Sequence, residues 1–384
     1  MKRTRILVLL LALVLCMSMA ACGGGSSTGG GSGDTPAASG AGDAGGGSDG
    51  AQIACVFGAG HAEGINDKAF IQDCWEGIKE FGDANGKTYA YYQPIDDSKQ
   101  SFLDAYDTAI KNGAEVVLTV GNEPSDSLVD ATRDNPDVKF ISIEATGFEE
   151  SAMPNHYSIL MNATDAGWLA GVAAVREGYK SLGILPCVAI PPVDMWTWGY
   201  VQGANYAANK YGIEGITLQH HYLNNWSASP EIQATAASWY NSGVEVIQCN
   251  TAGGNTSIIA ASDAAGAAVF GSDKDQFDEG ETVVTSEVVF RKPIVISSLE
   301  SAYDGSFPGG TFWLPGVEAD AAGLAMDRTR FKNYTKDMYD EDYADLKNDV
   351  GGIRSSMITI YDIPEVDDMW NAVSPKYIEF INIE

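Results

Sequence analysis

The sequence predicts an α/β protein made of two doubly wound parallel-sheet lobes joined by a hinge. From about residue 51 onward, apolar runs of strand length alternate with longer segments of helical period, an order typical of parallel sheets with helices on both faces. The alternation restarts after about residue 150. The folded part, about 330 residues, is also longer than one ordinary core supports. These observations favour two lobes over one.

The first round of the pattern contains four expected strands and three expected helices. Phe70, Cys74 and Phe81 belong to an apolar stripe with spacings of three and four, which is typical of a helix. Pro124 suits the first turn of the third helix, where no backbone N–H is needed. The expected strands are 53–57, 88–92, 114–120 and 138–143, and the expected helices are 68–81, 98–111 and 124–133.

The second round begins near residue 157. Its expected strands are 157–161, 181–189, 216–222, 244–249, 268–271 and 281–285, and its expected helices are 165–177, 193–210, 229–242, 256–265 and 288–303. We therefore expect residues 51–150 plus 280–312 to form the first lobe and residues 151–279 plus 313–384 the second. The hinge crossings are expected near 145–160, 272–285 and 305–318. Such lobes form a cleft that can close on a small molecule.

The N-terminus has the pattern of a secretory signal. Lys2, Arg3 and Arg5 precede the apolar run 6–16, which is too short to span a bilayer as a permanent helix. Small residues and then Cys22 follow, and this resembles the lipobox of bacterial lipoproteins, in which the cysteine is acylated. We expect a signal peptide over 1–21, a lipidated Cys22 and a flexible Gly/Ser tether over 22–50. The protein would then lie on the extracytoplasmic face of the cell membrane. A plain signal peptide with cleavage nearby is the alternative.

Charge and cysteine spacing exclude several classes of partner. The formal net charge of the chain is −29, which argues against nucleic-acid backbones and against a basic patch on anionic lipid. The cysteines show neither a CxxC motif nor a Cys/His metal spacing, so we expect no metal and no cofactor. Spacing does not fix any pairing among the cysteines that follow the tether, Cys55, Cys74, Cys187 and Cys249.

Five segments carry a resemblance to a known family. In order, they are GINDKAFIQDCWEG at 64–77, AGWLAGVAA at 166–174, GYVQGA at 199–204, AGG at 252–254 and GSDKDQ at 271–276. They are similar to segments of the basic membrane protein (PnrA-like) family, the purine-nucleoside receptors of ABC importers. The resemblance implies a type I periplasmic-binding-protein-like fold and a lipoprotein that delivers a purine nucleoside or purine base to an ABC permease. It also implies a monomer that is not an enzyme.

The resemblance also implies which residues bind the ligand. Phe70 and Trp196 would stack on the two faces of the purine, and Trp198 and Trp226 occupy similar positions. Polar contacts are expected from strand ends. Asp273 would accept hydrogen bonds from ribose hydroxyls, and Asn122 would read a base edge. The remaining expected site residues are Gly253, where the backbone can approach closely, Asp67 in the first motif and His61 in the loop before it.

Departures from the family pattern leave the ligand open. Gly58 stands where the family usually has Asp, Ile71 where it has Asn, and Val289 where it often has Lys. Because the family's Asp and Lys positions are associated with sugar and base contacts, a free base or another flat heterocycle is an alternative to a nucleoside. A receptor that feeds a signalling system is a second alternative. A two-lobed hydrolase or transferase is a third, although the sequence has no GxSxG, Walker A or HExxH motif.

Overall fold

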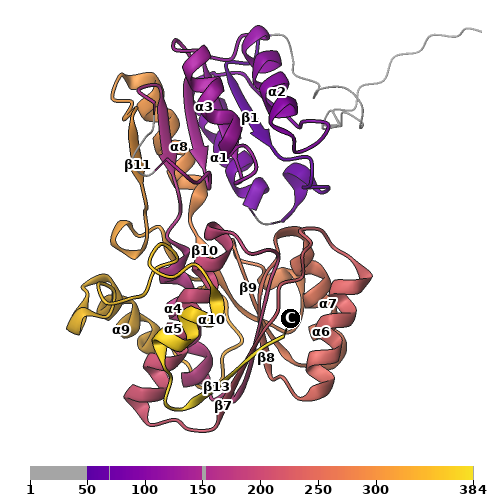
Figure 1. Cartoon of the computed structure of the whole chain (residues 1–384), viewed down its shortest axis with the longest axis vertical. Helices are drawn as coiled ribbons and strands as arrows, with labels where there is room; N and C mark the ends of the chain where they lie inside the picture. Colours follow the sequence, from indigo (N-terminus) through magenta and orange to yellow (C-terminus); the bar gives the residue numbers. More distant parts are fainter. Residues whose placement is uncertain (1–49, 69, 149–152, 384) are drawn as a thin grey trace, which may run out of the picture. The chain divides into compact units, whose positions relative to one another are not determined.

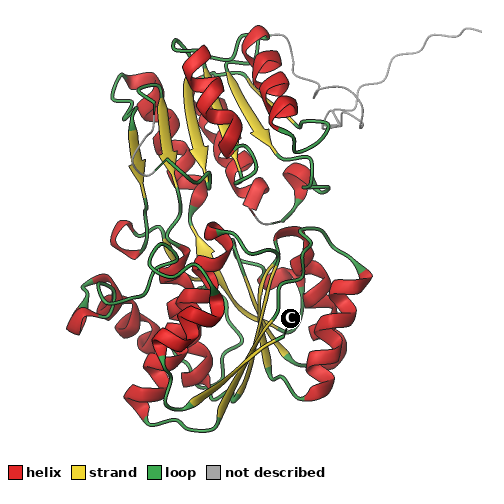
Figure 2. Ribbon diagram, viewed as in Figure 1, coloured by secondary structure: helices red, strands yellow, loops and turns green. Residues whose placement is uncertain are grey.

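The computed structural model describes residues 50–68, 70–148 and 153–383. The expected signal peptide, Cys22 and nearly all of the expected tether lie outside these ranges. The described chain contains two sheets with helices on both faces of each, as the sequence predicts (Figures 1 and 2). None of the helices within the described ranges is both long and apolar enough to cross a bilayer.

The first sheet has six parallel strands in the order β11-β5-β4-β3-β1-β2. Helices α1 and α8 pack on one face and α2 and α3 on the other. The strands are β1 (Ile53–Phe57), β2 (Tyr89–Tyr92), β3 (Val116–Val120), β4 (Lys139–Ile143), β5 (His156–Ile159) and β11 (Thr311–Trp313). The helices are α1 (Phe70–Asn85), α2 (Lys99–Lys111), α3 (Ser125–Asp134) and α8 (Arg291–Asp304).

The second sheet has seven strands in the order β12-β10-β9-β8-β6-β7-β13, and only β12 is antiparallel to its neighbour. Helices α4 and α5 cover one face, and α6 and α7 cover the other (Figure 1). The strands are β6 (Ser181–Pro186), β7 (Ile216–His220), β8 (Val246–Asn250), β9 (Ala268–Gly271), β10 (Val283–Val289), β12 (Ala322–Leu324) and β13 (Ile378–Asn382). The helices are α4 (Ala163–Glu177), α5 (Pro191–Tyr211), α6 (Pro230–Ser242), α7 (Asn255–Ala265), α9 (Lys336–Lys347) and α10 (Val366–Val373).

The sheet pairing corrects two of the expected lobe assignments. Strand β5, expected in the second lobe, pairs with β4 and β11 in the first sheet. Strand β10, expected in the first lobe, pairs with β9 and β12 in the second sheet and continues to Val289, where the sequence indicated the start of a helix. An apolar run of this length does not distinguish a buried strand from a buried helical turn. The chain therefore leaves one sheet for the other after β5, after β10 and after β11.

Helices α4 and α5 pack closely because glycines face each other across their contact. A Cβ atom at Gly171 would lie 2.1 Å from the carbonyl oxygen of Tyr200, and one at Gly203 would lie 2.0 Å from that of Trp168. Both obstacles are backbone atoms, so no side chain can move aside. The glycines within GWLAG and GYVQG, two of the segments that resembled the family, therefore set the distance between these helices.

Gly203→Ala should therefore destabilise the protein although alanine is the better helix former. We expect a loss of about 1–3 kcal/mol in the free energy of unfolding, because the added methyl group forces the two helices apart. Urea denaturation measures this loss. Asn209→Ala, at an exposed position of the same helix, is the matched control and should not reduce stability. Equal stability of the two variants would contradict close packing as the role of Gly203.

A carboxyl group is buried in the second sheet. Glu287 on β10 is fully buried, and one of its oxygens accepts a hydrogen bond from Gln248 Nε2 at 3.0 Å. Burial raises the pKa of Glu287 well above its usual range, and this hydrogen bond only partly opposes the shift. Above pH 4.5, the reference pKa of glutamate, the unfolded chain releases a proton that the native protein keeps. The free energy of unfolding therefore falls as the pH rises above 4.5 toward the raised pKa of Glu287 in the native protein.

Glu287→Gln should remove that pH dependence. The amide resembles the protonated acid but cannot ionise in either state, so the variant should be more stable than the parent by roughly 1–3 kcal/mol at pH 8 and nearly equal to it at pH 4.5. Denaturation curves at both pH values test this expectation. Glu341→Gln, at an exposed glutamate, is the control and should change stability little at either pH. A parallel shift for Glu287→Gln at both pH values would contradict the titration argument.

Candidate functional site

Five of the eight ligand-binding residues expected from the sequence line one cavity of about 50 Å³. They are His61, Phe70, Asn122, Trp196 and Asp273. The polar members come from the carboxyl ends of parallel strands: His61 lies in the loop after β1, Asn122 follows β3, and Asp273 follows β9. This edge of a doubly wound sheet is where ligands bind in α/β proteins. Because strands of both sheets contribute, the cavity is the candidate site of a two-lobed receptor.

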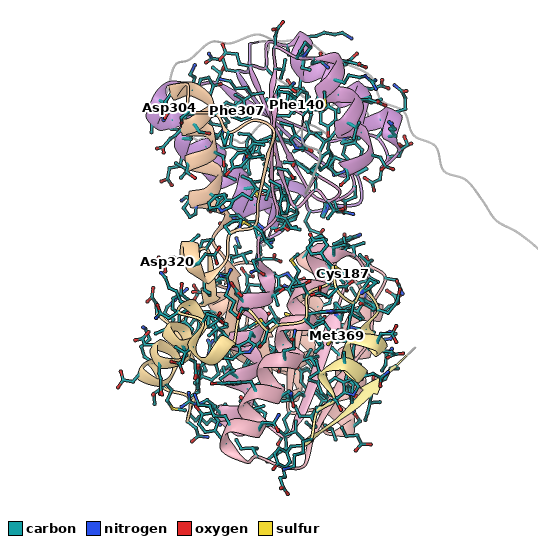
Figure 3. All side chains as sticks on the ribbon, turned by 60° about the vertical axis from the view of Figure 1, so that its left-hand side comes forward. Phe140, Cys187, Asp304, Phe307, Asp320 and Met369 are labelled. Atoms are coloured by element: carbon teal, nitrogen blue, oxygen red, sulfur yellow. The ribbon has the colours of Figure 1, made fainter. Side chains whose placement is uncertain are left out.

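Aromatic rings form much of the cavity wall. Phe70 is the first residue of α1, and Trp196, in the second turn of α5, is only 2% exposed. Trp226 also lines the cavity, and its ring lies 5.6 Å from that of His61. Phe70 belongs to the first lobe and Trp196 to the second, so a flat ligand in the cavity has an aromatic side chain from each. Cys187, labelled in Figure 3, follows β6 and adds a buried thiol to the lining.

The other three expected site residues do not line this cavity. The Asp67 carboxylate accepts hydrogen bonds from the backbone N–H groups of Ile71 and Gln72, at 2.9 and 3.0 Å. It thus caps α1 and holds Phe70 in place. Trp198 is fully buried, and its indole Nε1 donates to the Ile363 carbonyl at 3.0 Å, so it is a core residue.

Gly253 lies one residue beyond the cavity-lining Ala252 and faces a different neighbour. A Cβ atom there would lie 2.9 Å from Glu63 Oε2, which accepts a hydrogen bond from Ser227 Oγ at 3.1 Å. The glycine thus leaves room for a side chain of the first lobe against the second. Gly253 therefore serves a contact between the lobes beside the cavity, in place of the expected close approach to a ligand.

A histidine and a glutamate form an ion pair at one side of the cavity. His61 Nε2 lies 3.1 Å from Glu123 Oε1. Burial opposes a charge on His61, but the hydrogen bond and charge of Glu123, with the charges of Asp67 and Asp97, outweigh it and raise the pKa of His61. Burial likewise opposes ionisation of Glu123, yet His61 holds the pKa of Glu123 below its usual value. Glu123 is therefore a carboxylate that only accepts hydrogen bonds.

A buried arginine also lines the cavity and connects the two lobes. Arg291 is 3% exposed, and its Nη2 and Nε donate to Glu144 Oε1 at 2.9 and 3.2 Å. Its Nη1 lies 3.0 Å from Asp273 Oδ1, and its guanidinium lies 4.6 Å from the centre of the Phe70 ring. Burial raises the pKa of Glu144 to about 7, although Arg291 opposes this shift. Asp273, expected to bind ribose, is thus already paired with a cation.

Sequence reasoning missed Glu123, Glu144 and Arg291. Glu123 directly follows Asn122 at the end of β3, and Glu144 directly follows β4, so strand-end position was a usable signal for both. Arg291 lay inside the expected helix 288–303 and carried no local signal. Its two carboxylate partners lie in other segments, and Glu144 is 147 positions away. Only the folded chain brings them together.

The described ranges hold no group of three or more His, Cys, Asp or Glu side chains placed to bind a metal ion. The four cysteines that follow the expected tether are all free and buried, so the pairing that the sequence left open does not form. The cavity has aromatic walls and a few buried polar groups, a composition typical of small-molecule binding sites.

Comparison with known proteins identifies the family. The sequence profile described as ABC transporter substrate-binding protein, PnrA-like, matches residues 58–363, most of the chain. The chain belongs to the PnrA-like family. It is therefore an ABC transporter substrate-binding protein, and the family resemblance of the five sequence segments is confirmed.

The relatives of this PnrA-like protein include two that match more than two thirds of the chain. One is the "CD4+ T-cell-stimulating antigen" of Listeria monocytogenes, 27% identical over 299 residues that cover 72% of this chain and 80% of the relative. Another is the "ABC transporter nucleoside-binding protein BmpA" of Lactococcus lactis, 24% identical over 289 residues, or 69% of this chain and 80% of the relative.

Solved structures of ABC solute-binding proteins share the fold of this PnrA-like protein. The protein from Aeropyrum pernix superimposes with a TM-score of 0.65 at 17% identity and covers 84% of this chain and 89% of its own. The protein from Conexibacter woesei does so with a TM-score of 0.62 at 17% identity, over 78% and 96% of the two chains. The likeness confirms the expected type I periplasmic solute-binding fold.

Proposed function

We propose that this PnrA-like protein captures a purine nucleoside or purine base and delivers it to an ABC permease. The observation that carries the proposal is the pair of aromatic side chains, Phe70 from one lobe and Trp196 from the other, that line one small cavity. Every purine has two flat faces, and stacking on an aromatic ring contributes roughly 1–3 kcal/mol per base. The name of the Lactococcus lactis relative as a nucleoside-binding protein supports the same ligand class.

Contacts across the lobes support a closed, ligand-retaining arrangement. Lys68 Nζ lies 2.7 Å from Glu279 Oε2, and Glu63 contacts Ser227, in each case a residue of the first lobe with one of the second. Arg291 adds the buried ion pair to Asp273. A ligand between Phe70 and Trp196 adds apolar contact to both lobes, so it favours closure, and the closed form is the natural signal for docking on a permease.

The proposed location follows from the N-terminal pattern. Signal peptide cleavage before Cys22 and acylation of that cysteine would anchor a monomer on the extracytoplasmic face of the cell membrane, and the Gly/Ser tether would let it reach a permease. Mass spectrometry of the protein from its host membrane tests this point. A diacylglycerol adduct on Cys22 is the expected result, and an unmodified mature N-terminus elsewhere would contradict it.

Calorimetric titration of the purified protein tests the ligand class. We expect binding of purine bases or nucleosides and none of sugars or amino acids. Tighter binding of nucleosides than of the matching bases would indicate a sugar contact, despite the engagement of Asp273 with Arg291. Tighter binding of the bases would indicate that the cavity accepts the ring alone. Absence of binding by every purine would refute the proposed ligand class.

A further inference from the structure

Two buried polar atoms at the cavity have no hydrogen-bond partner within the described part of the chain. They are Nη1 of Arg291 and Oε2 of Glu123. Arg291 Nη1 lies close to Asp273 Oδ1, but the contact lacks the geometry of a hydrogen bond. An unsatisfied buried polar group lowers stability, and native structures rarely retain one without reason. A ligand in the cavity can satisfy both atoms at once.

The chemistry of the two atoms specifies what the ligand presents. A guanidinium has only donors, so Arg291 requires an acceptor. Glu123 is ionised and has only acceptors, so it requires an N–H donor on the ligand. Both side chains line the same small cavity, so one compact ring can carry both the acceptor and the donor. A ring carbonyl beside a ring N–H, the lactam edge of a 6-oxopurine, offers both groups on adjacent positions. Adenine offers them in the opposite order, with a ring nitrogen as acceptor beside an amine as donor, so a third group has to distinguish the two.

Asn122 argues against the amino counterpart. An asparagine reads an adenine edge with two bonds, since its amide N–H donates to a ring nitrogen and its carbonyl oxygen accepts from the exocyclic amine. In this protein Asn122 Oδ1 already accepts a hydrogen bond from Thr146 Oγ1 at 2.6 Å, with Ser125 Oγ at 3.4 Å. That leaves the amide N–H group of Asn122 as a second donor at the cavity. Arginine, by contrast, is the residue that pairs with a purine carbonyl and its neighbouring N7.

We propose that the cavity selects 6-oxopurines over 6-aminopurines, with Arg291 and Asn122 as donors to the carbonyl edge and Glu123 as acceptor of the adjacent ring N–H. The proposal rests on the function proposed above and narrows its ligand class. The charges agree with it, since a carbonyl oxygen carries partial negative charge toward Arg291 and a lactam N–H is a stronger donor toward a carboxylate than an amine. The pair of His61 and Glu123 keeps that carboxylate oriented.

Calorimetric titrations of the full chain with hypoxanthine, guanine and adenine, and with inosine and adenosine, test the proposal. We expect each oxopurine to bind at least 10-fold more tightly than its amino counterpart. 1-Methylhypoxanthine keeps the carbonyl but lacks the N1–H, so it should bind at least 10-fold more weakly than hypoxanthine. Equal or tighter binding of the aminopurines overturns the selectivity and leaves the proposed function intact. Absence of all purine binding overturns both.

Two variants test whether Arg291 and Glu123 cause the preference for 6-oxopurines. Arg291→Lys keeps the buried charge but replaces the forked donors, and it should reduce the ratio of hypoxanthine to adenine affinity at least 5-fold. Glu123→Gln should bind hypoxanthine and 1-methylhypoxanthine almost equally, because the charged acceptor is gone. Arg328→Lys is the matched control, since Arg328 is an exposed arginine paired with Asp275 and Asp278, and its ratio should equal that of the parent. An unchanged ratio in both Arg291→Lys and Glu123→Gln overturns the assignment.

Discussion

Arg291→Met should lower the free energy of unfolding by about 3–5 kcal/mol at pH 8, the largest effect we expect from a single substitution in this protein. The variant leaves two buried carboxylates, Glu144 and Asp273, without their shared cation. A buried charge that loses its partner keeps the cost of leaving water and gains nothing in return. Urea denaturation at pH 8 measures the loss.

The pH dependence of this variant separates electrostatics from packing. Because the pKa of Glu144 is already raised to about 7 beside Arg291, removal of the cation favours the neutral acid still further. At pH 5 Glu144 can be neutral in the variant, so the difference from the parent should shrink. Adding Glu144→Gln should recover part of the loss at pH 8. Arg328→Met removes an exposed arginine that also has two carboxylate partners, and it should cost less than 1 kcal/mol.

A loss that is the same at both pH values would contradict the electrostatic account, because packing does not titrate. The electrostatic account explains why removal of Arg291 alone is costly. It does not imply that the group of Arg291, Glu144 and Asp273 stabilises the fold. Replacing all three buried groups by apolar residues of similar volume is commonly neutral or stabilising. These three buried groups are therefore better explained by their position at the cavity, where each fixes the orientation of the others, than by a contribution to stability.

The fold followed from the sequence because the alternation of strands and helices is a local property. The residues that form a strand or a helix show its periodicity themselves, and the order in which strands and helices alternate predicts parallel sheets. The membership of β5 and β10 could not be predicted in the same way, since their apolar runs are alike and the choice of sheet depends on pairing with distant strands. The first two crossings between sheets were consequently placed too early, whereas the crossing after β11 begins within the expected range 305–318.

In the candidate site, too, the residues with a local sequence signal could be predicted, and those brought together only by folding could not. Phe70 and Trp196 could be expected because they lie at fixed places in recognisable segments, and both line the cavity. Trp198 illustrates the limit. Two residues further along α5, a side chain points about 200° away around the helix axis, so Trp198 enters the core. Arg291 and Glu144 could not be foreseen, since neither is distinctive until folding places them together.

Phe70→Ala and Trp196→Leu should each weaken purine binding by about 1–3 kcal/mol, or roughly 5- to 150-fold, the largest effects we expect on affinity. Leucine at 196 retains only part of the apolar volume, so the variant loses the flat ring and also some stability, and affinity is therefore measured where the variant is folded. Calorimetric titration with the tightest purine ligand measures both losses. Unchanged affinity in both variants would contradict the proposal that Phe70 and Trp196 stack on the ligand.

Matched controls separate stacking from general loosening of the protein. Phe307→Ala removes a partly buried ring that packs on Tyr157 in the first lobe and does not line the cavity. Trp198→Leu removes the buried indole that lies two residues after Trp196 along the chain. Both controls should lower the unfolding temperature yet leave affinity within about twofold at a temperature where they are folded. A loss of affinity in the controls equal to that in the site variants would show that packing, and not stacking, accounts for the effect.

The double variant tests whether both rings contact one ligand. If Phe70 and Trp196 lie against opposite faces of the same purine, removal of one lets the ring shift, and the second removal then costs less than it does alone. The two losses should therefore sum to more than the loss measured in the double variant, with a coupling energy of roughly 0.5–3 kcal/mol. Strictly additive losses would instead mean that the two rings contact separate parts of the ligand, which a free purine base is too small to provide.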